Sequence, residues 1–410
     1  MKNLAFASIG FCLIILSLAG CQNTFVTREE TPLNKSVMSA RLHGIIPLEP
    51  ARPPASHAFN TPATPSRESF DGLSDLRYEQ ATLTEDATWR GTVLIKGAVV
   101  VAPQATLRIE PGTTVRFARI EGSIKKARLV VLGRIQCIGT AERPIRFSSD
   151  APTPVRGDWG GILLLSTEKR NQFEHTSVEG AETGIEAHFS AFTAKSVRVT
   201  LSKTGVVLRD SIVSAESSSF SACETGIEVH DGEFELRDSS VSTNRLGMSL
   251  SRSSVVLTST SVTDNARYGI LAEECRLRIS SGSISSNGAG AVVTGGEGQI
   301  FMTRFMLNKD TALQLGSARM KVNRSLFADN DRDALRIEDG RATVWGCAFR
   351  GNGGFNLYNA GREVVTAVQN WWGGDDEKSV SSKVFGGSQE PRSGTVQVFP
   401  WLSSQPPILP

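Results

Sequence analysis

An apolar residue followed three positions later by asparagine recurs along this 410-residue chain at steps of 21 or 22 residues. The six pairs are Val241 and Asn244, Val262 and Asn265, Ile284 and Asn287, Phe305 and Asn308, Phe327 and Asn330, and Phe349 and Asn352. Val199 and Phe220 extend the apolar column backwards, and glycines share the interval at Gly184, Gly205, Gly226, Gly247 and Gly269. Self-similarity at a short fixed period indicates a solenoid, whose repeats pack only on their neighbours.

One period, residues 225–245, has the pattern of three short strands. Apolar residues alternate with polar ones at Ile227 and Val229 and again at Phe234 and Leu236, and Val241 then precedes the asparagine. Alternation with period 2, interrupted by turns, is typical of strands that have one buried face. The Leu-x-x-Leu-x-Leu spacing of leucine-rich repeats and the 3.6-residue period of helical repeats are both absent.

Equivalent residues of stacked repeats should lie about 4.8 Å apart, which is the ordinary spacing between strands. We therefore expect an internal amide ladder made of Asn244, Asn265, Asn287, Asn308, Asn330 and Asn352. Phe305, Phe327 and Phe349 should form an aromatic stack. Cys223 occupies the ladder position one repeat before Asn244, where we expect a small buried side chain.

These features resemble the right-handed parallel β-helix family known from pectate lyases and from many bacterial envelope proteins. The resemblance covers roughly residues 80–374 and implies an all-β, three-sheet solenoid of roughly 12–13 rungs. Looser opening rungs are expected around Trp89, 105–117, 132–135, 144–147 and 159–162. Asn370-Trp371-Trp372-Gly373 resembles the element that often closes such solenoids and covers their exposed strand edges, although tryptophans can also bind sugar. The tail, residues 375–410, should fold back over the last rung.

The N-terminal 21 residues resemble the signal and lipobox of bacterial lipoproteins. Lys2 precedes a short apolar run that ends in Leu18-Ala19-Gly20-Cys21. The resemblance implies removal of residues 1–20, acylation of Cys21 and attachment to a lipid bilayer. Gln22 resembles an outer-membrane sorting signal, and an ordinary secretory signal with a chance cysteine is the alternative. Residues 21–79, rich in proline and serine, are predicted to form a disordered tether.

The net charge does not favour nucleic acid as a partner, and the cysteine spacing argues against disulfide bonds. A formal net charge of +2 gives no global field that favours nucleic acid. Export makes disulfides conceivable, but Cys275 and Cys347 are more than three rungs apart, roughly 15 Å along the axis, beyond the reach of a disulfide. We therefore expect Cys137, Cys223, Cys275 and Cys347 to be buried small residues without a bonded partner.

Few residues remain for catalysis or metal binding. Asp329, Asp331 and Asp333 are the best candidates for a Ca²⁺ site, but acidic residues are also common in turns. The five histidines form no close pair that would favour copper, and Arg209 separates His188 from His230 in one column. Asp375-Asp376 lies beyond the closing element, where we expect a solvated loop. The paired-aspartate pattern of polygalacturonases and the Gly-His-Gly and Asp-Pro-His-Glu patterns of enzymes with this fold are not found, and only three tyrosines could stack on sugars.

The sequence thus predicts a noncatalytic, lipid-anchored envelope protein that acts as a scaffold or binding surface for a protein or polysaccharide. No cofactor is expected, and the chain is expected to be monomeric. A polysaccharide lyase or hydrolase with a nonstandard site is the runner-up, and a surface adhesin is a third reading. An outward cluster of acidic and basic side chains in one groove would favour the enzyme.

Overall fold

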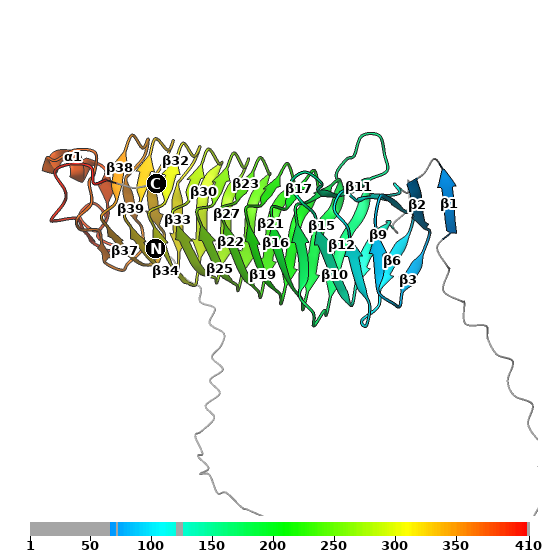
Figure 1. The fold of residues 1–410 in the computed structure, drawn as a ribbon. Coiled ribbons are helices and arrows are strands. Elements are labelled where there is room, and N and C mark those ends of the chain that lie inside the picture. The colour runs from blue at the N-terminus through cyan, green and yellow to red at the C-terminus, as the bar shows by residue number, and fades with distance from the viewer. Residues whose placement is uncertain (1–65, 71–72, 120–125, 408–410) are drawn as a thin grey trace, which may run out of the picture. The chain divides into compact units, whose positions relative to one another are not determined.

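The computed structural model describes residues 66–70, 73–119 and 126–407, which form three long β-sheets (Figure 1). The chain visits the three sheets in turn, so each circuit adds one strand to each of them. We call them sheets A, B and C in the order in which a circuit meets them. The predicted signal peptide, Cys21 and most of the predicted tether lie outside the described residues.

Sheet A contains β1 (Ser66–Phe70), β2 (Leu73–Tyr78), β5 (Thr92–Ile95), β8 (Thr114–Phe117), β11 (Ile145–Ser149), β14 (Thr176–Glu179), β17 (Arg198–Thr200), β20 (Ser219–Ser221), β23 (Ser240–Ser242), β26 (Ser261–Thr263), β29 (Ser283–Ser285), β32 (Arg304–Met306), β35 (Leu326–Ala328) and β38 (Ala348–Arg350).

Sheet B contains β3 (Ala81–Leu83), β6 (Ala98–Val101), β9 (Arg128–Val131), β12 (Trp159–Leu165), β15 (Ala181–His188), β18 (Thr204–Arg209), β21 (Thr225–His230), β24 (Leu246–Ser251), β27 (Tyr268–Glu273), β30 (Ala289–Thr294), β33 (Leu313–Gly316), β36 (Leu335–Ile337), β39 (Leu357–Asn359) and β41 (Val384–Phe385).

Sheet C contains β4 (Ala87–Trp89), β7 (Thr106–Ile109), β10 (Arg134–Ile138), β13 (Asn171–Glu174), β16 (Ala191–Lys195), β19 (Ile212–Glu216), β22 (Glu233–Arg237), β25 (Ser254–Thr258), β28 (Arg276–Ser280), β31 (Glu297–Phe301), β34 (Ala318–Asn323), β37 (Gly340–Trp345), β40 (Val365–Thr366) and β42 (Val396–Gln397).

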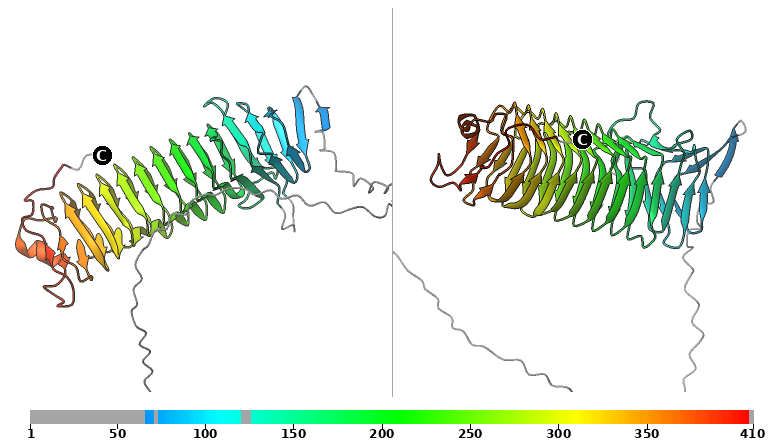
Figure 2. Two further views of the ribbon diagram at one scale, coloured as in Figure 1. Left: turned by 90° about the horizontal axis from the view of Figure 1, so that it is seen from below. Right: turned by 60° about the vertical axis from the view of Figure 1, so that its left-hand side comes forward.

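The register of the strands follows the sequence repeat. Phe220 pairs with Val241, which pairs with Val262, and the column continues in the same way to Phe349. Figure 2 shows the strands of each sheet lying side by side along the stack. In sheet A, β1 is antiparallel to β2, and the other 13 of the 14 strands run parallel to one another. The predicted three-sheet parallel solenoid is therefore confirmed.

The two ends of the solenoid differ from the boundaries expected at residues 80 and 374. At the N-terminal end, β2 already pairs in parallel with β5, so the stack begins before residue 80. At the other end, β41 and β42 continue sheets B and C, and the short helix α1 (Glu377–Ser382) lies before β41. The sequence did not indicate β1 and β2 because they lie before the recognised repeat. It did not indicate β41 and β42 because each contains only two residues. None of the helices in the described residues is long and apolar enough to span a membrane.

The asparagine ladder lies in the turns between sheets A and B, where all six side chains are buried. The Oδ1 atom of Asn287 accepts hydrogen bonds from the backbone N–H and the Nδ2 of Asn265, at 3.1 and 2.9 Å. Its own Nδ2 donates to the Val262 carbonyl and to Asn308 Oδ1. The residue before each asparagine has a positive φ, as at Thr243 and Ser286, so the turn exposes backbone groups that the amides satisfy.

Glycine is required in sheet B because successive turns approach closely there. A Cβ atom added at Gly226 would lie 2.7 Å from the carbonyl oxygen of Gly247 and 2.8 Å from Asn244 Nδ2. The glycine column therefore lets the strands of sheet B lie against the amide ladder.

Aromatic rings fill the C-terminal part of the core. The ring centroids of Phe305 and Phe327 are 4.9 Å apart, and those of Phe327 and Phe349 are 5.0 Å apart, with nearly parallel planes. Trp372 continues this stack at 4.8 Å from Phe349, and Trp371 forms a parallel bridge with Ala348. The Asn370–Gly373 segment thus ends sheet A, whereas sheets B and C extend beyond it.

The four cysteines of the described residues are buried and free, as the spacing predicts. The N–H of Cys223 donates to Asn244 Oδ1, so this residue starts the amide ladder. Burial raises the pKa of the Cys347 thiol to about 12, and it also raises the pKa values of Cys137, Cys223 and Cys275.

We predict that Asn287→Leu destabilises the solenoid by about 2–4 kcal/mol, because it leaves buried amide donors without acceptors. Chemical denaturation followed by circular dichroism would measure the loss. The matched control is Asn323→Leu, whose side chain lies on the outer side of sheet C. Equal free energies of unfolding for the two variants would contradict the ladder.

We also predict that the four buried cysteines do not react with a thiol reagent at neutral pH until the protein unfolds. Their raised pKa values keep them protonated, and burial excludes the reagent, whereas the thiolate is the reactive form. The test uses protein with Cys12→Ser and Cys21→Ser, and an added Ser214→Cys on the outer face should react at once. Rapid labelling of the native protein without the added cysteine would refute the expected burial.

Candidate functional site

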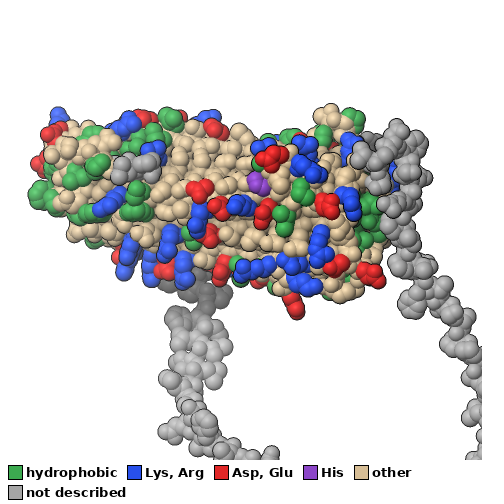
Figure 3. Space-filling view, viewed as in Figure 1, with side chains coloured by type: hydrophobic (Ala, Val, Ile, Leu, Met, Phe, Trp, Pro, Cys, Tyr) green, Lys and Arg blue, Asp and Glu red, His purple; other side chains and the backbone are tan. Residues whose placement is uncertain are grey.

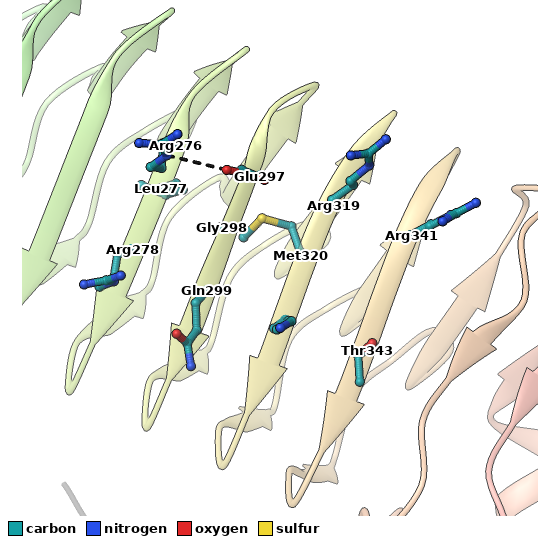
Figure 4. Close-up of a pocket in the computed structure, with 11 residues that line it drawn as sticks. Arg276, Leu277, Arg278, Glu297, Gly298, Gln299, Arg319, Met320, Arg341 and Thr343 are labelled. Carbon is teal, nitrogen blue, oxygen red and sulfur yellow. Dashed lines mark ion pairs between the residues drawn. The ribbon is translucent and has the colours of Figure 1, made fainter.

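A hollow lies on the outer face of sheet C, over β28, β31, β34 and β37 (Figure 4). Its volume is about 650 Å³. In the view of Figure 3, Lys and Arg side chains gather along the lower edge of the solenoid. Figure 1, seen from the same side, labels β25 and β34 in this region. We call this feature the sheet C hollow.

Two columns of outward side chains form the walls of the sheet C hollow. The strand register aligns the first column as Arg276, Glu297, Arg319 and Arg341, and the second column as Arg278, Gln299, Lys321 and Thr343. Neighbours within a column are about 4.8 Å apart along the axis, and the two columns are about 6.7 Å apart along each strand. Five of these eight positions therefore carry a positive charge.

Gly298 lines the floor of the hollow, at an inward position of β31. Gly298 lies in register between Leu277 and Met320. A Cβ atom at Gly298 would lie only 2.1 Å from the Leu277 carbonyl oxygen and 3.1 Å from Met320 Cε. The missing side chain leaves room for the Leu277 backbone and the end of the Met320 side chain beneath the two rows of cations.

Most of the positive charge at the hollow is not neutralised locally. Arg276 lies 3.5 Å from Glu297, and Arg341 lies 3.4 Å from Glu363. Arg278, Arg319 and Lys321 have no ion-pair partner in the part of the chain that the structure describes. Such an array can bind several anionic groups of one ligand, and the planar guanidinium groups favour carboxylates and phosphates.

The sequence by itself does not distinguish these cations from other surface charges. They occur at the same 21–22-residue interval as the core columns, but at the outward positions of the alternation. A search for charged residues that repeat in register would have found Arg319 and Arg341. Gly298, on the floor of the hollow, lies outside the repeating glycine column and has no distinctive local motif.

The three candidate aspartates have separate roles. Asp329 pairs with Arg350 at 3.2 Å. Asp333 accepts hydrogen bonds from Arg336 and from the backbone N–H of Phe355. Among the described residues, no group of three or more His, Cys, Asp or Glu side chains is placed to hold a metal ion.

Asp331 lines a second hollow, of about 560 Å³, on the outer side of sheet B together with Asp310, Asp333, Arg332 and Arg336. This is the outward cluster of acids and bases that would favour an enzyme. Many of its members bind one another, since Arg332 lies 3.6 Å from Asp310 and Arg336 contacts both Asp333 and Glu338.

The aromatic rings beside this second hollow are also occupied. The Arg336 guanidinium lies 4.1 Å from the centroid of the Tyr358 ring. Phe385 stacks on Tyr358 with centroids 4.4 Å apart and planes 4° from parallel. Contacts with Arg336 and Phe385 therefore compete with any sugar that would stack on the Tyr358 ring.

The comparisons with known proteins concern the fold. Residues 78–189 match the family model of the pectate-lyase-like β-helix domain, and residues 177–304 and 225–371 match that of the right-handed β-helix region. No curated protein matches this chain.

Several solved structures resemble the chain weakly. The A-module of a mannuronan C-5 epimerase from Azotobacter vinelandii is 14% identical with a TM-score of 0.46, covering 77% of this chain and 91% of the module. A mutant of the periplasmic alginate epimerase AlgG is 8% identical with a TM-score of 0.43, covering 81% and 85%. An alginate lyase from Paenibacillus is 12% identical with a TM-score of 0.27, covering 72% and 93%. At these identities and scores, the neighbours assign no activity to this chain. The two family matches and the three parallel sheets together identify the described part of the chain as pectate-lyase-like right-handed β-helix domains.

Proposed function

We propose that this protein is a noncatalytic envelope protein, anchored by an acylated Cys21, whose sheet C hollow binds an acidic polysaccharide. The observation that carries the proposal is the in-register array of Arg276, Arg278, Arg319, Lys321 and Arg341 over a glycine floor. The array is open and runs along the solenoid axis, so a chain with repeated negative charges can contact several rungs at once.

The chemistry at the hollow favours binding over catalysis. Its one lining carboxylate, Glu297, already contacts Arg276. The planar, charged guanidinium groups of the arginines suit them to hold anionic groups. Release of the ligand's counterions should make the binding sensitive to salt, since most of the cations are exposed.

Location in the envelope rests on the lipoprotein signal that the first 21 residues resemble. A lipid anchor at Cys21 and a tether formed by the residues between Cys21 and β1 would let the hollow reach a polymer outside the bilayer. Labelling with radioactive palmitate, with Cys21→Ala as the control, would test the anchor independently of any ligand.

We predict that the protein binds polygalacturonate and alginate at low salt and that Arg319→Glu with Lys321→Glu weakens this binding roughly tenfold, because two attractive contacts become repulsive. Affinity electrophoresis or calorimetry would measure the change. The matched control, Arg245→Glu with Lys309→Glu, makes the same change of charge in the turns between sheets A and B. Equal losses in both double variants would indicate a nonspecific charge effect and would contradict the proposed surface.

The acidic and basic cluster of the second hollow supports a second candidate, a polysaccharide lyase or hydrolase. Asp331 is its one lining carboxylate with no protein partner among the described residues, so it is the candidate base.

If this second candidate holds, polyuronates or other glycans incubated with the protein should yield unsaturated ends that absorb ultraviolet light, or new reducing ends. The Asp331→Asn variant should abolish both, while Asp329→Asn should not. We expect neither product, and a signal that depends on Asp331 would replace the noncatalytic proposal with the enzyme.

A further inference from the structure

A third hollow, of about 320 Å³, lies where the turn between β10 and β11 meets the outer face of sheet A. This turn, residues 139–144, is longer than the turns that lead from sheet C to sheet A in the next rungs. Those turns have one or two residues, with a positive φ at positions such as His175 and Ser196. The long turn supplies one wall of the hollow through residues that include Thr140 and Pro144. We call this feature the sheet A hollow.

The wall formed by the long turn is held in place by contacts with the rungs on both sides. Arg143 Nη2 donates to the carbonyl oxygen of Pro111 at 2.8 Å, and the Gly112 N–H donates to the Arg143 carbonyl at 2.9 Å. On the other side, a Cβ atom added at Gly139 would lie 2.7 Å from the His175 carbonyl oxygen. The wall is therefore ordered before any ligand arrives, which lowers the entropy cost of binding.

The opposite side of the sheet A hollow is one outward column of sheet A. The strand register aligns this column as Arg146, Ser177, Arg198 and Ser219. Arg146 and Arg198 thus lie on the two sides of Ser177, each about 4.8 Å from it along the axis. Both guanidinium groups can therefore reach one small ligand that lies over Ser177.

The basic side chains of the sheet A hollow are not engaged by the protein. Among the residues that the structure describes, the side chains of Arg146, Arg198 and His175 have no hydrogen-bond or ion-pair partner. Glu142 belongs to the long turn but does not line the hollow. Hydrogen bonds with its own backbone N–H and with Thr140 lower the pKa of the Glu142 carboxyl group.

The absence of a lining carboxylate distinguishes this hollow from the other two. Glu297 lines the sheet C hollow, and Asp310, Asp331 and Asp333 line the second hollow. The sheet A hollow is lined only by basic, hydroxyl and small apolar side chains. An anion that enters it therefore meets hydrogen-bond donors and positive charge, with no acidic group in the lining to repel it.

We propose that the sheet A hollow binds the phosphate group of a phosphate monoester. A phosphate group has acceptor oxygens in several directions, and the lining donors come from several elements: guanidinium groups from β11 and β17, an imidazole from the turn before β14, and hydroxyls such as Ser177. Guanidinium groups bind phosphate oxygens in pairs, which favours phosphate over a single point charge. Several lining side chains are exposed, so the group that carries the phosphate can extend into solvent.

The experiment titrates the full-length chain with Cys21→Ala, which removes the acylation site, with glycerol phosphate and with acetate at one ionic strength, by calorimetry. We expect glycerol phosphate to bind at least tenfold more tightly than acetate. Arg146→Gln with Arg198→Gln should weaken phosphate binding at least tenfold, because it removes two charged donors. Acetate binding as tight as that of glycerol phosphate would overturn the proposal.

The matched control is Arg116→Gln with Arg304→Gln, which removes the same charge from outward positions of β8 and β32 in the same sheet. This control should bind glycerol phosphate normally, and equal weakening in both double variants would refute a specific site. The Arg146→Gln, Arg198→Gln protein should still bind polygalacturonate, so the sheet A hollow and the proposed function of sheet C are tested separately.

A second arm separates a soluble phosphate monoester from a lipid headgroup. The same protein is mixed with phosphatidylcholine vesicles that do or do not contain phosphatidic acid, and flotation measures the bound fraction. Binding to glycerol phosphate alone would identify a soluble ligand, and binding to phosphatidic acid vesicles would identify a headgroup. Either result supports the proposal if Arg146→Gln with Arg198→Gln abolishes it, and binding in neither arm would overturn it.

Discussion

Parallel hydrogen bonding between successive turns is the constraint on which the rest of this structure depends. Because each strand pairs in register with the strand one repeat earlier, every residue lies over its counterpart about 4.8 Å away. A side chain is therefore acceptable only if it tolerates a similar side chain above and below it. Asparagine satisfies this condition through amide bonds, phenylalanine through ring stacking and glycine by leaving space.

The same stacking generates the outer surfaces. Inward columns are selected for packing, but outward columns are free to vary, so any chemistry that repeats there becomes a row. Arginine and lysine form such rows over β28–β37 of sheet C, and hydroxyl groups form them over β20–β29 of sheet A. A solenoid can thus present different ligand chemistries on different faces without changing its core. This property fits a protein that holds extended polymers better than one that encloses a small molecule.

Much of the fold could be predicted from the residues alone. The Phe305, Phe327 and Phe349 column and the asparagine three positions after each residue indicate the register directly, because a buried position in a solenoid repeats at every turn. The ends were harder to predict. Strands β41 and β42 contain two residues each, and so short a segment has no period from which it can be recognised. The aspartates at 329–333 looked like one cluster in sequence, but the turn directs Asp329 toward Arg350 and Asp333 toward Arg336.

By itself, the sequence determined the repeat, the three-strand turn, the buried asparagine and aromatic columns, and the isolation of the cysteines. Each of these follows from local alternation and from a fixed interval between equivalent residues. Only the tertiary structure decided which outward side chains become neighbours and which charges remain unpaired. Arg278 and Lys321 are 43 positions apart in sequence and two rungs apart in space. The hollow that they line is likewise a property of the packed sheet and not of any one segment.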